Sequence, residues 1–330
     1  MTPRRTVVRS SCWRPRCFLS CTSVWPDPGM IPGMRIVSAG ERTAYWSEGT
    51  RSEIVLAGGD DDGSLAVLAE VLPPGQGPPL HSHPQDETFI VLSGTLTVWS
   101  IRVEELDDTG DPWTPALLAR GIRCEAGGVV RVPGGRAHCY RVDGVRPAEV
   151  IVLSHPSGLE EWTRAFGVPA TGPGLPPDGF TAPQSDRARM VAFSASVGVR
   201  RHGPPAPLAA AQDDALAAPD RIESLPLRAG VSHGLRLSTD AVYLVVEGRA
   251  DFVAGGERHP LDAGGCVRVP AGVAHVWTAG AGAGAVVLVL DGDGIDGDGL
   301  DKDVLDGDGL DGDGLGPDPA GARPTRAVFR

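Results

Sequence analysis

Glycine and proline interrupt the chain at short intervals, and this spacing limits its fold more than any other feature. The 330 residues include 45 Gly and 30 Pro but only 7 Phe and 3 Tyr. Such a composition favours short strands joined by many turns over long packed helices. We therefore expect an all-β fold, and the length allows two domains that each bury a core.

Strand-like segments gather in two stretches, which predicts two barrels or sandwiches in tandem. After the first stretch, Leu159, Trp162 and Phe166 recur at helical spacing, with Ser157 as the expected N-cap and Gly167 as the stop. A short helix should therefore close the first domain, and a helical turn is expected at 187–193. The predicted strands are 53–57, 65–72, 87–92, 96–103, 129–132, 150–153, 242–246, 250–253, 266–269 and 285–290.

These elements divide the chain into five parts. The predicted division is an extension (1–33), a first domain (34–170), a linker (171–221), a second domain (222–290) and an acidic tail (291–330). The tail holds most of the formal net charge of −12, because residues 291–315 contain ten Asp and one Lys in a repeated Asp-Gly-Asp-Gly-Leu or Ile. The repeat lacks the register and closing Glu of a calcium loop, so we expect the tail and the extension to be disordered.

The remaining composition excludes two kinds of partner. Basic residues cluster only in the extension, so we expect no nucleic acid, and no apolar run reaches membrane-spanning length. Cys12, Cys17 and Cys21 lie in the extension, and the other three cysteines lie in strand-like sequence. Their spacing fits neither a zinc motif nor a small secreted disulfide framework, which favours a soluble protein of the reducing cytoplasm.

One histidine pair carries the chemistry of the first domain. His81 and His83 are two residues apart, so on an extended segment both imidazoles leave the same face. Glu87 opens the next strand after a turn-prone Pro84-Gln-Asp and brings a carboxylate back towards them. Further along, an apolar strand runs through a Pro-Gly-Gly turn into a strand that begins with His138, which offers a fourth ligand.

The two stretches match both motifs of the cupin superfamily, and the chain resembles its members there. The first motif is met by Gly75, His81, His83, Glu87 and Gly94, and the second by Gly127, Pro133, Gly135 and His138. Val142 replaces the Asn that ends the second motif. The resemblance implies a jelly-roll β-barrel that binds metal through His81, His83, Glu87 and His138.

The second domain repeats only half of this pattern. Gly264, Pro270, Gly272 and His275 reproduce the second motif. Counting back from Gly248, the positions of the first-motif ligands fall on Leu235, Leu237 and Ala241, none of which can bind a metal. The chain thus resembles a bicupin, two jelly-roll barrels in tandem. The first barrel has a complete set of metal ligands, and the second is degenerate, so that His275 is expected to be structural.

Three imidazoles and one carboxylate suit one divalent transition metal, whether Fe, Mn, Ni, Co, Cu or Zn. Such a set leaves one or two coordination positions for water, a substrate oxygen or dioxygen. Strand alternation from the ligands turns Phe89, Val91, Tyr140 and Val142 inward, which predicts a mostly apolar substrate pocket. We therefore expect a planar, apolar small molecule rather than a phosphorylated sugar.

Residues 35–170 also resemble the quercetinase-like branch of bacterial cupins. The resemblance implies a flavonol dioxygenase in which the metal chelates the deprotonated substrate, Glu87 is the catalytic base, and dioxygen adds across the heterocycle. The sequence leaves three functions open: a metal-dependent dioxygenase of a flavonol-like or other enolisable aromatic, a non-oxidative isomerase, lyase or cyclase, and a non-catalytic small-molecule-binding cupin. A homodimer is the default expectation for the fold.

Overall fold

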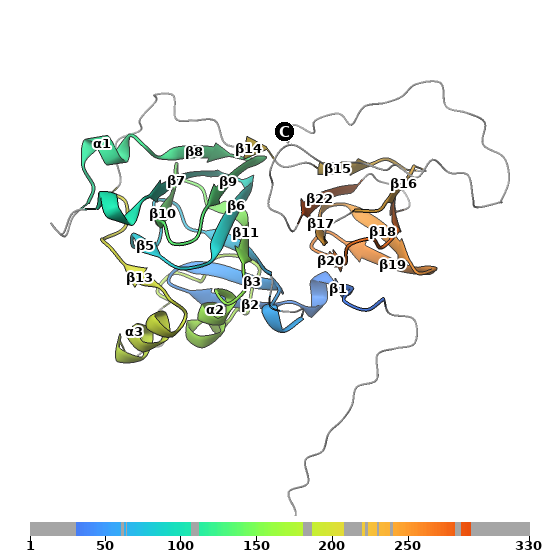
Figure 1. Cartoon of the computed structure of the whole chain (residues 1–330), viewed down its shortest axis with the longest axis horizontal. Helices are drawn as coiled ribbons and strands as arrows, with labels where there is room; N and C mark the ends of the chain where they lie inside the picture. The colour runs from blue at the N-terminus through green and yellow to red at the C-terminus, as the bar shows by residue number, and fades with distance from the viewer. Residues whose placement is uncertain are drawn as a thin grey trace, which may run out of the picture. The chain divides into compact units, whose positions relative to one another are not determined.

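The computed structural model describes residues 31–291 except 61–62, 64, 107–111, 181–186, 208–219, 222–223, 230, 238–239 and 281–284. The predicted disorder of the extension and of the acidic tail, together with Cys12, Cys17 and Cys21, lies outside the described residues. Within them, the expected all-β architecture of two tandem jelly-roll barrels is confirmed (Figure 1).

Two sheets form the first barrel, and the strands of each run antiparallel to their neighbours. In order, the larger sheet is β12-β2-β3-β4-β11-β6-β9-β14 and the smaller is β13-β5-β10-β7-β8. Their bounds are β2 Thr43–Ser47, β3 Thr50–Leu56, β4 Ala66–Leu72, β5 His81–Ser82, β6 Asp86–Ser93, β7 Thr95–Ile101, β8 Ile122–Glu125, β9 Gly128–Val132, β10 Ala137–Val142, β11 Ala148–His155, β12 Val168–Pro169, β13 Arg200–Arg201 and β14 Asp220–Arg221.

Alternation along these strands fills the interior of the first barrel with apolar side chains. On β4, for example, Leu68 and Leu72 pack inside, whereas Val67, next to Leu68, packs in a different cluster on the other face. The tight turn after β6 needs glycine, because Gly94 has φ of 82° and a Cβ there would lie 2.8 Å from Ala148 Cα. The interior cluster includes Ile54, Leu68, Leu72, Phe89, Val91, Leu96, Val98, Val130, Val142, Val150 and Val152.

The second barrel also consists of two antiparallel sheets, and these have fewer strands in the described residues than those of the first barrel. Their orders are β1-β20-β17-β22-β15 and β16-β21-β18-β19. Its core is rich in large aromatic side chains, with Tyr243, Phe252 and Trp277 fully buried at its centre. The bounds are β1 Arg35–Val37, β15 Ser224–Leu227, β16 Ser232–Leu235, β17 Ala241–Glu247, β18 Arg249–Ala254, β19 Glu257–Asp262, β20 Cys266–Val269, β21 His275–Ala279 and β22 Ala285–Asp291.

The barrels share a strand pairing and an apolar cluster. Strand β1 precedes the first barrel in the chain, yet it pairs with β20 of the second, with Ile36 opposite Val267. Leu56, Ile90 and Ile151 of the first barrel lie in one buried cluster with Val242, Leu244 and Cys266 of the second. The domain limits predicted at 34 and 222 are therefore crossed by packing that joins the two barrels.

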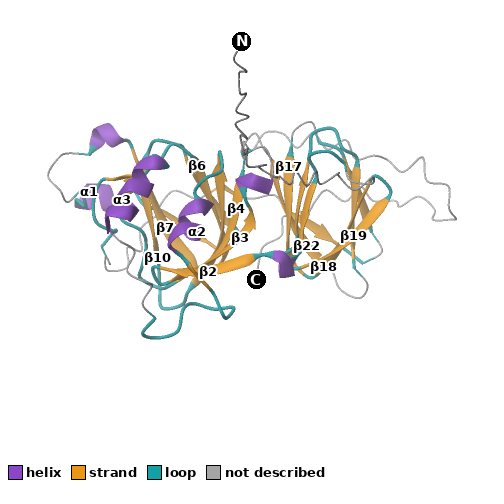
Figure 2. Ribbon diagram, turned by 90° about the horizontal axis from the view of Figure 1, so that it is seen from below, coloured by secondary structure: helices purple, strands orange, loops and turns teal. Residues whose placement is uncertain are grey.

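The helices are short and lie outside the strands (Figure 2). None of the described helices is long and apolar enough to cross a membrane. They are η1 Ala39–Glu41, η2 Gly58–Asp60, η3 Val103–Glu105, α1 Pro115–Leu118, α2 Glu160–Phe166 and α3 Arg187–Ser196.

Two local predictions need correction. The helix α2 ends at Gly167 as expected, but its N-cap is Leu159 and not Ser157, because the Ser157 hydroxyl donates to the carbonyl of Gly63 at 2.8 Å. The strand predicted at 96–103 stops at Ile101, because the backbone turns into η3. The other predicted strands lie within one or two residues of observed ones, except that the strand predicted at 53–57 begins three residues after the start of β3 at Thr50.

Candidate metal centre

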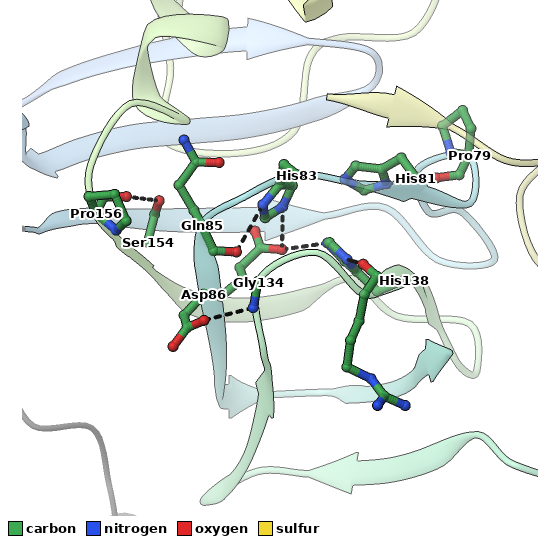
Figure 3. Close-up of polar contacts among 11 residues, drawn as sticks. Pro79, His81, His83, Gln85, Asp86, Gly134, His138, Ser154 and Pro156 are labelled. Atoms are coloured by element: carbon green, nitrogen blue, oxygen red, sulfur yellow. Dashed lines mark hydrogen bonds and ion pairs between the residues drawn. The ribbon is translucent and has the colours of Figure 1, made fainter. Parts of the chain in front are cut away.

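Three histidines from two neighbouring strands of the smaller sheet converge at one point (Figure 3). His81 lies on β5 and is the register partner of His138 on β10, and His83 follows β5 directly. One ring nitrogen from each lies within 4.8 Å of those of the other two. The Gly135 amide, in the turn between β9 and β10, donates to the His83 carbonyl at 2.7 Å and holds that turn against the segment after β5.

Each of these imidazoles is oriented by a backbone carbonyl. The Nδ1 atoms of His81, His83 and His138 lie 2.8, 3.0 and 2.9 Å from the carbonyl oxygens of Pro79, Gln85 and Arg136. A carbonyl oxygen only accepts, so each Nδ1 must carry the proton and donate. The rings therefore direct their Nε2 atoms towards the common point, where the neutral form of each ring offers a lone pair, and this is the usual second-shell arrangement of metal-binding histidine.

Glu87 supplies a carboxylate to the same point. Its Oε2 lies 2.9 Å from His138 Nε2 and 3.5 Å from His83 Nε2. Burial opposes its charge, but the neighbouring His138 and His83 rings outweigh burial and hold the pKa of Glu87 far below its usual range. The carboxyl group is therefore ionised at neutral pH.

The surroundings shift the pKa values of His81 and His138 in opposite directions. Burial, with the charge of His138 beside it, lowers the pKa of His81 to about 4, so His81 is neutral at physiological pH. Burial also opposes the charge of His138, but its hydrogen bond to Glu87 raises the pKa of His138 above its ordinary value. His138 and Glu87 thus form the most strongly coupled pair of the site.

The donor set fits a divalent transition metal. His83 Nε2 is buried and has no hydrogen-bond partner in the part of the chain that the structure describes. A buried imidazole nitrogen with a free lone pair needs a hydrogen-bond donor or a Lewis acid, and a cation shared with the neighbouring nitrogens supplies the latter. The three-histidine cluster is a site for one such ion, and Glu87 as its fourth ligand remains a prediction.

Residues 69–107 match the model of the Cupin domain, a span that includes His81, His83 and Glu87. The solved structures that resemble the chain extend the likeness over both barrels. A point mutant of oxalate decarboxylase from Bacillus subtilis has a TM-score of 0.52 at 13% identity, covering 80% of this chain and 78% of that chain. Both barrels have the cupin fold.

Two further solved structures agree with this conclusion. A structure from a study of the Mn(II) centres of Bacillus subtilis oxalate decarboxylase has a TM-score of 0.51 at 13% identity, with 80% of this chain and 78% of that one covered. A third, from a study of substrate binding and reaction specificity in oxalate decarboxylase, has a TM-score of 0.51 at 14% identity and the same coverage. No curated protein sequence matches the chain.

A cavity of about 210 Å³ opens in the first cupin barrel beside the β10 strand that carries His138. Of the predicted pocket residues, Tyr140 lines this cavity, whereas Phe89, Val91 and Val142 pack in the core. The Phe89 ring meets the Tyr140 ring edge to face, with 5.5 Å between centroids. The full lining is Ser47, Glu48, Thr50, Ser52, Glu70, Pro73, Gln76, Gly77, Pro78, Tyr140, Trp162 and Thr163.

The lining includes a residue that sequence reasoning missed. Glu70 lies on β4 between the core residues Leu68 and Leu72, so it occupies an inward position of a barrel strand. The signal was present in the sequence, because a carboxylate between two apolar residues of the same face is unusual unless it has a role.

The segment predicted as a linker packs against β5, the strand that carries His81. Strand β13 pairs with β5, placing Arg201 opposite His81, and His202 Nε2 lies 2.8 Å from the Ser82 hydroxyl. The Leu80 amide also donates to the carbonyl of Pro204 at 3.3 Å. These contacts fix the short strand that bears His81.

The second cupin barrel has no equivalent donor set among the residues that the structure describes. Leu235 is the register partner of His275, as His81 is of His138, and Leu235 and Leu237 are buried in the core. His275 Nε2 lies 2.8 Å from the Tyr243 hydroxyl. Because Nδ1 of His275 donates to the Val273 carbonyl at 2.9 Å, Nε2 accepts from Tyr243 and is occupied.

Proposed function

We propose that this chain is a metal-dependent cupin enzyme, and specifically a dioxygenase that acts on a flavonol-like or other enolisable aromatic molecule. The observation that carries the proposal is the placement of an ionised carboxylate, Glu87, within 2.9 Å of the His138 nitrogen in a three-histidine site. A cavity beside β10, the strand that carries His138, offers room for a small molecule in the same barrel.

The proposed acid–base residue is Glu87. A bound metal supplies Lewis acidity, which makes a coordinated hydroxyl more acidic. Within the described residues, Glu87 Oε2 is the carboxylate oxygen that contacts His138 and His83, so it is placed to accept the hydroxyl proton. A carboxylate held ionised by two imidazoles is a weak base, and it therefore suits an acidic phenol or enol rather than an unactivated carbon acid.

His138 supports this role by its position. Its Nδ1 donates to the Arg136 carbonyl at 2.9 Å, so the ring cannot rotate away from Glu87 without losing a buried hydrogen bond. In the proposal, His81, His83, His138 and Glu87 hold the metal, and Glu87 also moves the proton. The buried thiols of Cys124, Cys139 and Cys266 support the inference of a reducing, cytoplasmic compartment.

The test measures oxygen uptake by the full chain. Protein is stripped with a chelator, reloaded separately with Fe, Mn, Ni, Co, Cu or Zn, and mixed with 3-hydroxyflavone and with quercetin in an oxygen electrode. We expect metal-dependent uptake with at least one metal, lost in His83→Ala and unchanged in His275→Ala. Turnover under strict anaerobiosis would replace the dioxygenase with a non-oxidative enzyme, and binding without product would replace it with a binding protein.

A further inference from the structure

The cavity beside β10 is lined by a carboxylate, Glu70, that the metal site does not explain. Glu70 on β4 has Ser52 of β3 and Val150 of β11 as its register partners, so its side chain belongs to the middle of the larger sheet. The Ser52 hydroxyl donates to Glu70 Oε1 at 2.6 Å. The second oxygen, Oε2, has no hydrogen bond to any described residue, and the carboxyl group lines the cavity.

Glu70 is electrostatically linked to the metal centre. Desolvation in the barrel raises the pKa of Glu70 to about 7, and the charge of Glu87 adds to the rise while the bond from Ser52 opposes it. The two carboxylates therefore act on each other across the barrel interior. Tyr140 lines the cavity and lies two residues after His138 on β10, so the side chains of Tyr140 and His138 leave the same face of that strand.

The chemistry of the lining selects the kind of group that can enter. The cavity is lined by two carboxylates, Glu48 and Glu70, and by the Tyr140 phenol, for which no hydrogen bond is found among the described residues. Its lining residues include neither Lys nor Arg. The basic residues near the second motif are engaged elsewhere: Arg136 binds Ser100, and Arg141 binds Asp143.

Above about pH 7, where Glu70 is mostly ionised, an anionic group in this cavity would face two carboxylates with no Lys or Arg in the lining to compensate them. A group that donates hydrogen bonds meets the opposite situation, because Glu70 Oε2 is available as an acceptor. Backbone contacts keep the wall in place, since a Cβ on Gly77 would lie 1.7 Å from the Tyr140 carbonyl oxygen. The loop before His81 thus packs tightly against β10.

We propose that Glu70 is a specificity residue, accepting a hydrogen bond from a hydroxyl group of the substrate at the end remote from the metal. The cavity would then select neutral, polyhydroxylated aromatic molecules and reject small dicarboxylates. This assignment rests on the proposed function for the metal-bound end of the substrate, and it adds the recognition of the distal end.

The experiment compares two probes with the same chelating end. Quercetin and 3-hydroxyflavone share the enol and the keto oxygen, but only quercetin carries hydroxyls on its other rings. The full chain is loaded with Zn(II), which has no redox chemistry, and binding is followed by probe absorbance. We expect quercetin to bind at least about tenfold more tightly than 3-hydroxyflavone, as one good hydrogen bond to a buried carboxylate allows.

Two variants test whether Glu70 causes the difference in affinity between the two probes. Glu70→Gln should bring the ratio of quercetin to 3-hydroxyflavone affinity towards one while leaving the affinity for 3-hydroxyflavone unchanged. Glu149→Gln, an exposed carboxylate on the neighbouring strand β11, is the matched control and should change neither affinity. Oxalate in excess should not displace quercetin from the wild type.

The outcomes separate this inference from the proposed reaction. A wild-type ratio near one, displacement by oxalate, or failure of both probes to bind would overturn the inference, and none of these readings depends on the folding of a variant. An unchanged ratio in a folded Glu70→Gln variant would overturn it as well. A large ratio of quercetin to 3-hydroxyflavone affinity without oxygen uptake would support the role of Glu70 and refute the dioxygenase. Oxygen uptake with an affinity ratio near one would support the dioxygenase and refute the role of Glu70.

Discussion

The two barrels share a contact between strand and turn but differ in the side chains at the positions of the metal ligands. Asp86 accepts from the Gly134 amide at 2.7 Å and pairs with Arg131, and in the second barrel Asp240 accepts from the Ala271 amide at 2.8 Å and pairs with Arg268. The same strand-to-turn contact is thus kept in both. The contact belongs to the fold, since it remains where the metal ligands are missing.

The second-motif histidines show the difference most sharply. His138 and His275 both donate Nδ1–H to the carbonyl two residues before them, at 2.9 Å in each case. The Nε2 of His138 faces Glu87, whereas the Nε2 of His275 accepts from Tyr243, which stands at the position of Phe89 relative to the turn glycine. One aromatic hydroxyl thus occupies the nitrogen that the first barrel leaves for a metal.

The largest expected effect is stabilisation by metal. An ion that binds the folded protein alone should raise its free energy of unfolding by about 4.1 kcal/mol at a free metal concentration of about 1,000 times Kd. Urea unfolding of chelated and Ni(II)-loaded protein measures this gain. The gain should vanish in His83→Ala and persist in His275→Ala, and equal gains in the two variants would break the comparison of the barrels.

The next effect is the pH dependence that Glu70 gives to the first barrel. Its pKa is about 7 in the folded protein against an ordinary value of 4.5, so the folded state binds more protons between these values. The free energy of unfolding should therefore fall as pH rises from about 4.5 to 7, by up to about 3 kcal/mol, and level off above that.

The Glu70→Gln variant isolates this contribution in chelated protein. The free energy of unfolding of Glu70→Gln minus that of the wild type should increase between about pH 4.5 and pH 8, because the variant lacks the titrating group. Glu149→Gln serves as the control with no such trend. A difference that is flat with pH, or that decreases, would refute the raised pKa.

A smaller effect is expected from Tyr243→Phe in the second barrel. The substitution removes the hydroxyl that donates to His275 Nε2 and leaves that buried nitrogen without this partner. We expect a loss of about 2 kcal/mol in the free energy of unfolding, with unchanged metal content. Urea denaturation and elemental analysis check both parts, and a gain of a second metal ion would mean that the Tyr243 hydroxyl alone suppresses that site.

The smallest effect tests the shared scaffold. Asp86→Ala and Asp240→Ala each remove one charge-assisted hydrogen bond to a turn amide, and each should cost about 1 kcal/mol of the free energy of unfolding. Similar losses in the two variants would sharpen the view that this contact is common to both barrels. A loss confined to Asp86→Ala would instead tie the contact to the metal centre.

The sequence predicted the parts of this structure that depend on local spacing. The strands that bear His81, His83 and His138 follow from turn residues and alternation, and the register of Leu235 opposite His275 agrees with the position counted back from Gly248. Spacing alone did not reveal contacts between distant segments. The pairing of β1 with β20 and of β13 with β5 depends on tertiary packing that no local pattern encodes.

The predicted pocket residues show the same limit of local sequence patterns, here for individual side chains. Alternation correctly turned Phe89 inward, but it could not distinguish a side chain that fills the core from one that lines a cavity. Which residues bound an open space depends on how two sheets and the helix α2 pack together. Only Tyr140 of the predicted pocket residues meets the cavity, and the carboxylate of Glu70 defines its chemistry.

The metal content of three proteins tests the central claim most directly. Wild type, His83→Ala and His275→Ala are purified without chelators, checked for folding by circular dichroism, and measured by elemental analysis. The account predicts one divalent transition-metal ion per chain in the wild type and in His275→Ala, and none in His83→Ala. A full metal complement in His83→Ala, or its loss in His275→Ala, would contradict the assignment of the live site to the first barrel.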